Sequence, residues 1–310
     1  MSDGWFEAFT EVVINPLRLL PSTEALYAEY DVHALQPAST RTRIGEHSTW
    51  DQVLWEAFLH QRHHIDAMAG LLDDGPIRDE TRRVVVLDIG CGPATVALAL
   101  AEAFAAWEVE TGFDYIGVDH NVHSLHLAAR MLHESKLLAS VGSQSLQQRL
   151  AAGVATATEW LGHQDVLLVT TSFLFHQHLP EAWLRQLAKH LQVLAAAADA
   201  VGTTLLFAGV DAVAGSTNLD RFLELARETG VRRKTLVREV VDHDLQFVTL
   251  HPEEGKRLLA DVPHPQSLDR WIYSFRPGTP SPATKVKARA GGHKANGHQP
   301  HIPTRERADR

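Results

Sequence analysis

The segment of residues 84–95 constrains the fold of this chain more than any other feature of the sequence. An apolar run leads to Asp88, Gly90 and Gly92 follow, and a helical pattern starts at Ala94. Glycine has no Cβ, so the backbone at these two positions can approach a ligand closely. Amides at the start of the following helix can hold a polar or anionic group. The segment therefore predicts a strand, a ligand-binding turn and a helix.

The turn departs from two common nucleotide-binding motifs. A P-loop requires Gly-Lys-Ser/Thr, which this segment lacks. A dinucleotide-binding fingerprint requires a third glycine at position 95, where this chain has Thr95, and the acid that precedes the turn also differs from that fingerprint. These differences argue against both motifs.

Strand-like and helical patterns alternate from residue 82 onward, which is typical of a parallel sheet covered by helices on both faces. The expected strands are 83–88, 115–119, 153–158, 165–171, 203–210, 237–250 and 270–275, and the expected helices are 94–104, 124–133, 181–197 and 218–229. We expect the last two strands to form an antiparallel pair at the sheet edge. The prediction is an α/β fold with a doubly wound, seven-stranded, mostly parallel sheet and an antiparallel edge strand.

The two ends of the chain differ from this central part. Residues 1–80 are predicted to form a helical extension, with helices at 22–30 and 48–72. The segment from 277 to 310 is rich in Pro, Gly, Lys and His without periodicity, so we expect it to be disordered. The expected organisation is a helical lid (1–80), a catalytic domain (81–276) and a basic tail (277–310).

Charge and composition limit the classes of molecule that this chain is expected to bind and the cell compartment in which it is expected. The net charge is −9, but residues 283–310 carry seven basic and two acidic side chains, or +5, so residues 1–282 carry −14. An acidic body argues against a broad phosphate-binding surface, and a nucleic acid would need the tail or a local patch. No apolar run approaches the roughly 20 residues of a membrane span. The N-terminus lacks a signal-peptide pattern, and the single Cys91 cannot form an internal disulfide, so the expected location is the cytoplasm.

The turn resembles motif I of the class I S-adenosylmethionine-dependent methyltransferases, whose pattern is a hydrophobic strand, Asp/Glu-x-Gly-x-Gly and a helix. Asp88, Gly90 and Gly92 match this pattern position by position. The resemblance covers about residues 82–275 and implies a Rossmann-like sheet. It also implies that the turn, with Cys91, cradles the methionine part of S-adenosylmethionine and that Asp88 lies near its amino group.

A second acid strengthens this resemblance. Residues 115–119 read as a strand ending in Asp119, where the family places an acid that binds the ribose hydroxyls, and His120 follows it. A carboxylate there can accept two hydrogen bonds. The alternative is that Asp119 caps the next helix.

Two further cofactor contacts are implied by the resemblance. Thr156, or Thr158 beside Glu159, stands where the family often has an acid that contacts the adenine amino group. Trp160 can stack on adenine or pack in the core. Thr171 ends the expected fourth strand and completes the predicted cofactor-binding set.

The segment after the fourth strand carries the predicted catalytic residue. Residues 172–180 resemble the stretch found in small-molecule methyltransferases of the ubiquinone-biosynthesis type, and they lack the Asn/Asp-Pro-Pro-aromatic element that holds a flipped adenine. His176 is the predicted general base at the carboxyl edge of the sheet, and His178 is a weaker candidate. The alternative is that His176 only packs locally.

Other residues have predicted roles outside the cofactor site. Arg41, Arg43 and Trp50 are predicted acceptor-binding residues in a lid of residues 36–50, although solvated or packing roles are alternatives. Tyr27, Tyr30, Trp55 and Phe58 can line the same pocket or pack between helices. Two groups of histidines have a spacing that could share a metal ion, namely His120, His123 and His126, and the pair His63-His64. A solvated, histidine-rich helix is the favoured interpretation, so no metal is expected.

The predicted function is methyl transfer from S-adenosylmethionine to a small-molecule acceptor. One alternative is a methyltransferase acting on RNA or protein, with the basic tail binding nucleic acid. Another is a non-catalytic binding or scaffold protein with the same fold. The intact Asp88, Gly90, Gly92 and Asp119 favour an enzyme over a scaffold.

Overall fold

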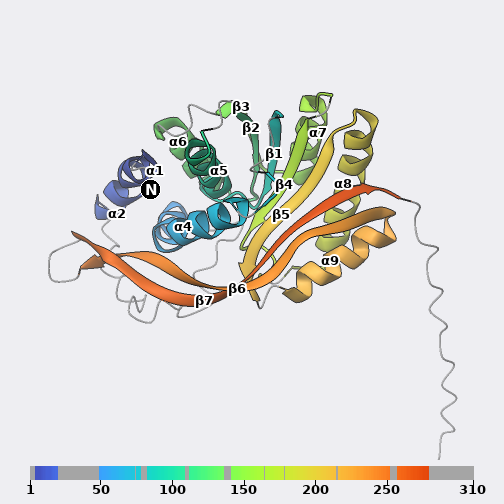
Figure 1. The fold of residues 1–310 in the computed structure, drawn as a ribbon. Helices are drawn as coiled ribbons and strands as arrows, with labels where there is room; N and C mark the ends of the chain where they lie inside the picture. Colours follow the sequence, from blue (N-terminus) through green and yellow to red (C-terminus); the bar gives the residue numbers. More distant parts are fainter. Residues whose placement is uncertain are drawn as a thin grey trace, which may run out of the picture.

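A computed structural model describes residues 4–19, 49–73, 75–77, 82–108, 112–135, 141–163, 165–177, 179–213, 216–251 and 257–278. These residues form a central sheet with helices on both faces (Figure 1). Within these ranges, no helix has the length and apolarity to cross a membrane. The expected helix 22–30, Arg41, Arg43, His178 and the tail beyond residue 278 lie outside the described residues.

The sheet has seven strands in the order β3-β2-β1-β4-β5-β7-β6. Their bounds are β1 Val84–Ile89, β2 Phe113–Val118, β3 Val141–Gln147, β4 Val166–Ser172, β5 Thr204–Ala212, β6 Val231–His251 and β7 Arg257–Pro277. The first five strands are mutually parallel, whereas β7 runs antiparallel to both β5 and β6. The predicted mostly parallel sheet with an antiparallel pair at one edge is therefore confirmed.

The central strands are apolar because they are covered on both faces. Every residue of β1 and β2 is buried, as is common for strands inside a parallel sheet. The chain reverses its order of addition to the sheet between β1 and β4, so the loops after these two strands lie at a topological switch point, where ligands bind in open α/β sheets.

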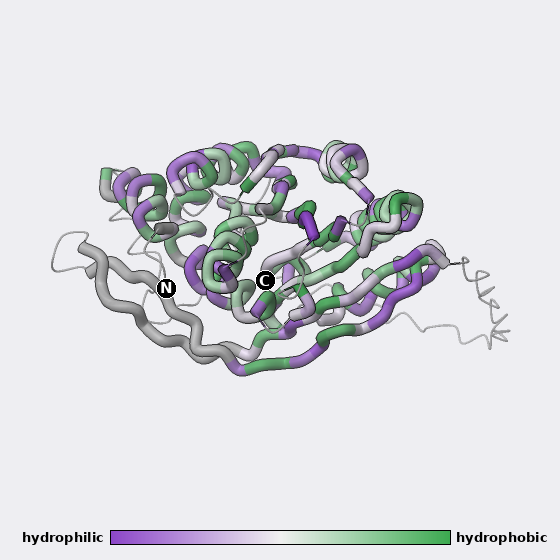
Figure 2. The backbone as a smooth tube through the Cα atoms, turned by 45° about the horizontal axis from the view of Figure 1, so that its top comes forward, coloured by the Kyte–Doolittle hydropathy of each residue, from purple (hydrophilic) through white to green (hydrophobic). Residues whose placement is uncertain are grey.

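Helices of the described residues cover both faces of the sheet. The helices α4 (Trp50–Asp73), α5 (Thr95–Ala106) and α6 (Val122–Glu134) share one hydrophobic core with alternate residues of the strands. The helices α7 (Leu150–Trp160), α8 (Glu181–Ala200) and α9 (Ser216–Glu228) share a second core on the other face. Hydrophilic and hydrophobic residues alternate along these helices in Figure 2, as expected for helices buried on one side.

The predicted strand at 153–158 is wrong. These residues lie in α7, where Gly153, Val154 and Ala157 are buried on one side of the helix. The hydroxyls of Thr156 and Thr158 donate to the carbonyls of Ala152 and Val154 within the same helix. The third strand is instead β3, a partly exposed edge strand whose Ser and Gln residues lack the apolar run of a buried strand.

The described N-terminal residues are helical, as predicted. The chain forms α1 (Gly4–Phe9), a π-helical turn η1 (Thr10–Ile14) and α2 (Asn15–Leu19), and then α4. Buried side chains of these elements join the core shared by α4, α5 and α6. Trp55 and Phe58 are buried in this core, which confirms the packing alternative for both residues. The domain boundary at residue 80 stays a prediction.

The antiparallel pair β6–β7 is longer than the sequence predicted. β7 pairs with β5 between Leu268 and Phe275, whereas β6 pairs with β7 along nearly its whole length. The two strands therefore continue beyond the sheet as a two-stranded ribbon that passes α4 (Figure 1).

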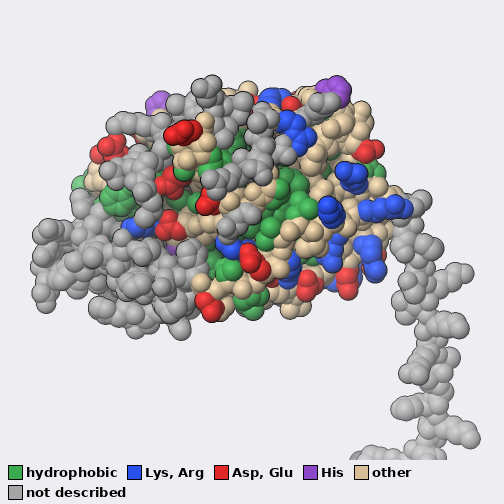
Figure 3. Space-filling view, viewed as in Figure 1, with side chains coloured by type: hydrophobic (Ala, Val, Ile, Leu, Met, Phe, Trp, Pro, Cys, Tyr) green, Lys and Arg blue, Asp and Glu red, His purple; other side chains and the backbone are tan. Residues whose placement is uncertain are grey.

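Exposed basic residues gather at one end of this pair. Arg232, Arg233 and Lys234 of β6 are exposed, and Arg232 pairs in register with the exposed Arg276 of β7. Figure 3 shows blue side chains at this end of the molecule. Because Phe275 pairs with Leu205 near the start of β5, these residues lie at the amino edge of the parallel strands.

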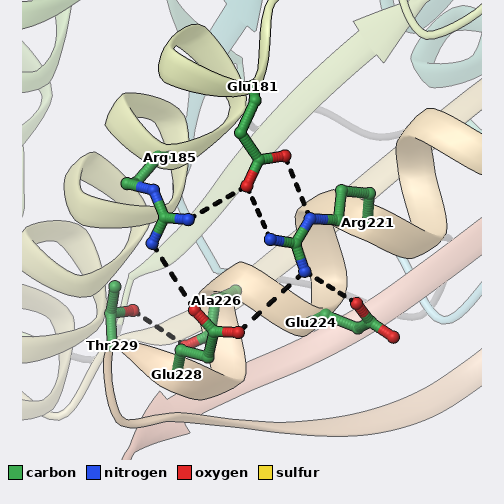
Figure 4. Close-up of polar contacts among 7 residues, drawn as sticks. All are labelled: Glu181, Arg185, Arg221, Glu224, Ala226, Glu228 and Thr229. Atoms are coloured by element: carbon green, nitrogen blue, oxygen red, sulfur yellow. Dashed lines mark hydrogen bonds and ion pairs between the residues drawn. The ribbon is translucent and has the colours of Figure 1, made fainter. Parts of the chain in front are cut away.

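An ion-pair network joins α8 to α9 on the surface (Figure 4). Arg221 of α9 donates from Nε and Nη2 to the two carboxylate oxygens of Glu181 on α8. Arg185 connects Glu181 with Glu228, and Arg221 also contacts Glu224. Exposed ion pairs contribute little to stability, so the buried residues that α8 and α9 share in one core hold the two helices together more than this network does.

Candidate functional site

The glycine-rich turn after β1 is held against the end of β2. The amides of Gly90 and Cys91 both donate to the carbonyl of Val118, at 2.8 and 3.0 Å. Gly90 and Gly92 have φ angles of 74° and 49°, a region that favours glycine. Apart from Gly92 and its two chain neighbours, no atom of the described residues would lie within 4 Å of a Cβ on Gly92, so the space beside this residue is open. The turn therefore forms a rigid cradle with room on its outer side.

Asp119 connects this turn to the start of α6. Its Oδ2 accepts from the amide of Gly92 at 3.0 Å, and its Oδ1 accepts from the amide of Asn121 at 2.9 Å. The side chain of Asn121 caps α6 by accepting from His123 and Ser124, so the capping role predicted as an alternative for Asp119 belongs to Asn121. Burial raises the pKa of Asp119, while the two amide hydrogen bonds oppose that rise.

Asp88 lies inside the sheet. It is fully buried, and it accepts from the hydroxyls of Tyr115 on β2 and Thr170 on β4 at 2.8 and 3.0 Å. Burial raises its pKa to about 7. Its hydrogen bonds tie the strand that carries the turn to both neighbouring strands, so Asp88 acts here as a positioning residue.

The other predicted cofactor-binding residues differ in burial and in their distance from the turn. Cys91 and Thr171 are buried, whereas His120 is more than half exposed, with Nδ1 3.8 Å from Oδ1 of Asp119. Thr156 lies in α7, so it does not stand at the strand end on which its adenine contact was predicted. The structure therefore brings together Gly90, Cys91, Gly92, Asp119 and His120.

A second loop, residues 173–177, lies beside this turn at the carboxyl end of β4. The carboxylate of Asp211, at the end of β5, accepts from the amides of Phe175 and His176. The side chain of Asn218, on α9, donates to the carbonyls of Phe175 and Gln177 at 2.7 and 2.9 Å. Residues from two other elements therefore fix the conformation of this loop.

His176 is oriented by the same carboxylate. Its Nδ1 lies 2.9 Å from Oδ1 of Asp211, whose side chain is 1% exposed, while 31% of the His176 side chain is exposed. Because a carboxylate can only accept, this contact favours the tautomer with the proton on Nδ1 and a lone pair on Nε2. The imidazole thus has the arrangement of an oriented general base.

Helix α4 contacts both loops. The Gln61 amide donates to the carbonyl of Pro93 at 3.0 Å, and the ring of His64 stacks on Phe173 with 3.8 Å between centroids. Phe173 has a φ of 52°, an uncommon value for a bulky residue that is often found at functional sites. The first turn of α4 instead faces α6, because Trp50 packs against His126, with their ring centroids 5.2 Å apart.

Sequence reasoning missed several residues of this site. Asp211, Asn218 and Gln61 carry no local motif, and only the tertiary structure brings them to the two loops. The interpretation of the α4 histidines as a solvated face is wrong, because His63 is 3% exposed and His64 packs on Phe173. Their spacing with His60, at i, i+3 and i+4, was the signal that could have identified this cluster.

The strand order, with β7 reversed between β5 and β6, and the glycine-rich turn after β1 define a Rossmann-like α/β fold. No protein-family model matches the sequence, and no curated protein matches it. Solved structures similar to this chain include a SAM-dependent O-methyltransferase from Thermotoga maritima, with 16% identity over 70% of this chain and 66% of that chain and a TM-score of 0.36.

Two further similar structures are also methyltransferases by their descriptions. A putative class I S-adenosylmethionine-dependent methyltransferase from Listeria monocytogenes has 12% identity over 92% of each chain and a TM-score of 0.44. The C-terminal domain of precorrin-6Y C5,15-methyltransferase from Rhodobacter capsulatus has 14% identity over 64% of this chain and 88% of that chain, with a TM-score of 0.32. The fold assignment rests on the strand order and direction in this chain.

Proposed function

We propose that this chain is an S-adenosylmethionine-dependent methyltransferase that acts on a small-molecule acceptor. The observation that carries the proposal is the cradle at the switch point, where the open side of Gly92 adjoins the carboxylate of Asp119. Two of the solved structures similar to this chain are described as S-adenosylmethionine-dependent methyltransferases.

The residues of the cradle fit the cofactor. Gly90 and Gly92 allow the methionine part to approach the backbone, and the buried Cys91 side chain leaves that surface clear. Each carboxylate oxygen of Asp119 has a second lone pair beyond its amide hydrogen bond, so Asp119 can also accept from ribose hydroxyls. His120 lies at the exposed rim of the cradle. Thr156 and Thr171 stay predicted cofactor contacts.

The chain's own chemical task is to position the acceptor and remove its proton. When bound, S-adenosylmethionine supplies an activated methyl group, so the protein does not need to create an electrophile. Nε2 of His176 accepts the proton of the acceptor, and the carboxylate of Asp211 stabilises the imidazolium that results. Loss of this base should reduce the rate by about 10²–10⁴-fold.

A small acceptor fits the charge distribution better than a nucleic acid does. The exposed basic residues Arg232, Arg233, Lys234 and Arg276 lie at the amino edge of the sheet, opposite the edge that carries the cradle and His176. A polyanion bound there would lie away from the catalytic loops. Arg41, Arg43 and Trp50 remain proposed acceptor contacts.

Transfer of labelled methyl groups tests this proposal. The wild-type chain and the His176→Gln variant are incubated with methyl-labelled S-adenosylmethionine and with separate small-molecule, RNA and protein fractions of a cell extract. We expect label in the small-molecule fraction with wild type and at least 100-fold less with the variant. Label in RNA or protein alone would contradict the acceptor class, and cofactor binding without label in any fraction would support a binding or scaffold role.

A further inference from the structure

Three histidines on α4 form a compact cluster that the proposed methyl transfer does not use. His60, His63 and His64 each offer a ring nitrogen, and these nitrogens all lie within 4.8 Å of one another. Positions i, i+3 and i+4 share one face of a helix, so the backbone of α4 holds the three side chains together.

The cluster lies beside the loop of residues 173–177, with His63 buried and His60 and His64 partly exposed. The His63 and His64 ring centroids are 4.3 Å apart, and His64 stacks on Phe173 at the start of the loop that carries His176. His63 is 3% exposed, and 20% of the His60 side chain is exposed. The three rings therefore occupy a packed position that solvent reaches at His60 and His64.

The electrostatic setting keeps these rings neutral. Burial, followed by the charge of the neighbouring His176, lowers the pKa of His60 to about 4. Burial and the charges of His60 and His176 hold the pKa of His64 well below its ordinary value. Neutral imidazole is the form that ligates a metal ion.

A carboxyl group adjoins the cluster. Oε2 of Glu56 lies 3.9 Å from Nε2 of His60, and this oxygen is buried without a hydrogen-bond partner among the described residues. Burial raises the pKa of Glu56 to about 8. A cation held by the histidines would stabilise the ionised form of this acid, which gives the cluster both neutral ligands and an adjacent negative charge.

We propose that His60, His63 and His64 bind one divalent first-row transition ion, with Zn²⁺ as the best match. Imidazole nitrogen is a preferred ligand of this ion class, and three protein ligands leave a fourth position for water or a substrate atom. In a tetrahedral site with Zn–N bonds of about 2.1 Å, ligand nitrogens stand about 3.4 Å apart. The rings must therefore approach one another by at most about 1.4 Å from their present limit of 4.8 Å.

The site suggests a role only in combination with the proposed function. If the chain transfers methyl groups, an ion beside the loop of His176 would bind an anionic or oxygen-bearing acceptor and orient it toward the base. This role rests on the proposed function, whereas metal binding itself does not. The test is therefore made without S-adenosylmethionine, so that failure of one proposal is distinguishable from failure of the other.

Titration of the chelator-treated full chain with Zn²⁺, by calorimetry, tests the site. Its matched pair of variants is His60→Gln/His64→Gln on α4 and His123→Gln/His126→Gln on α6, which each remove two histidines from one helix. We expect one tight equivalent in the wild type and in the second variant, with at least 100-fold weaker binding in the first. Equal binding by both variants, or no tight equivalent in the wild type, would overturn the proposal.

A measurement on the unmodified sequence covers the case in which the cluster variant fails to fold. Diethyl pyrocarbonate modifies accessible histidines, and mass spectrometry locates the modified residues. One equivalent of Zn²⁺ is expected to slow modification of His60 and His64 and to leave His120 unchanged. Protection confined to other histidines, including those beyond residue 278, would place the tight site elsewhere and overturn the proposal.

Discussion

Oδ1 of Asp211 lies 2.9 Å from Nδ1 of His176, although 35 positions separate the two residues in the chain. The contact exists because β4 and β5 are parallel neighbours that end at the same edge of the sheet. The same carboxylate accepts from the amides of Phe175 and His176, so it fixes both the loop and the ring. The proposed base is thus oriented by an element that follows it in the sequence.

Asp211→Asn is expected to reduce methyl transfer by about 10–100-fold while leaving cofactor affinity within twofold of wild type. The amide cannot accept from every group that the carboxylate now holds, so both the loop and the imidazole lose their fixed orientation. The measurement combines label transfer with calorimetry of S-adenosylmethionine binding. An unchanged rate would contradict the orienting role of Asp211.

Asp119→Asn is expected to weaken S-adenosylmethionine binding by about 1–3 kcal/mol, the range of a hydrogen bond to a charged group. The variant loses an acceptor toward either Gly92 or Asn121 as well as the charge toward the ribose. Asn121→Ala serves as its control, because that change removes the α6 cap at a cost of about 1 kcal/mol in stability. If both variants bind the cofactor equally well, Asp119 is not a ribose ligand.

Asp88 gives the wild type a pH-dependent stability that Asp88→Asn lacks. Its pKa is about 7 in the folded chain, against an ordinary value of 3.8, so its contribution is fully present below pH 3.8 and is lost as pH rises through 7. Between pH 5 and pH 8, the free energy of unfolding of wild type should fall by about 2–3 kcal/mol relative to the variant.

Urea unfolding at these two pH values measures that difference. Asp199→Asn, at an exposed position of α8, is the matched control and is expected to follow wild type. A difference between wild type and Asp88→Asn that does not change with pH would show that Asp88 is ionised inside the sheet.

His60 contributes a pH dependence of the opposite sign. The pKa of His60 is about 4 in the folded chain, against an ordinary value of 6.5. Between pH 4 and pH 6.5, the unfolded chain therefore binds a proton at this residue that the folded chain does not bind. The free energy of unfolding therefore falls as pH decreases from 6.5 toward 4. With chelator present, wild type should lose about 2 kcal/mol more than His60→Gln between pH 7 and pH 5.

Chemical denaturation at the two pH values checks this expectation. His126→Gln, at an exposed position of α6, should lose as much stability as wild type does. Equal losses in His60→Gln and wild type would mean that His60 is already protonated in the folded chain.

The sequence predicted the parts of the fold in which local pattern and tertiary environment agree. The apolar run before Asp88 and the acid at Asp119 mark strands that are buried on both faces, and those strands carry the cradle. By contrast, β3 is a partly exposed edge strand rich in Ser and Gln, and the Ala, Thr and Val residues of α7 suit a strand or a helix. Local composition therefore pointed to the wrong segment for the third strand.

For a related reason, only some of the site residues could be inferred from the sequence. His176 and the glycines follow strands directly, so their place at the sheet edge can be inferred from the chain itself. The partner of His176 and the packing of His64 on Phe173 depend on how β5 and α4 dock in the fold. The spacing of residues along the sequence does not reveal this docking. The histidine cluster is a product of this docking.

Cofactor binding by the cradle is the central claim, and Gly92→Val tests it most directly. Beyond its chain neighbours, the new Cβ would meet no described atom within 4 Å, so the side chain would enter open space and compete with the ligand rather than with the fold. Gly202→Val is the matched control, because Gly202 has a φ of 71° and lies before β5, at the opposite edge of the sheet.

Calorimetric titration with S-adenosylmethionine and S-adenosylhomocysteine should give micromolar binding in wild type and in Gly202→Val, and at least 100-fold weaker binding in Gly92→Val. Both valine variants share the strain of a positive φ, so this difference would report the cradle alone. Equal affinity in the two variants, or no binding of either compound by wild type, would contradict the assignment of the turn as the cofactor site.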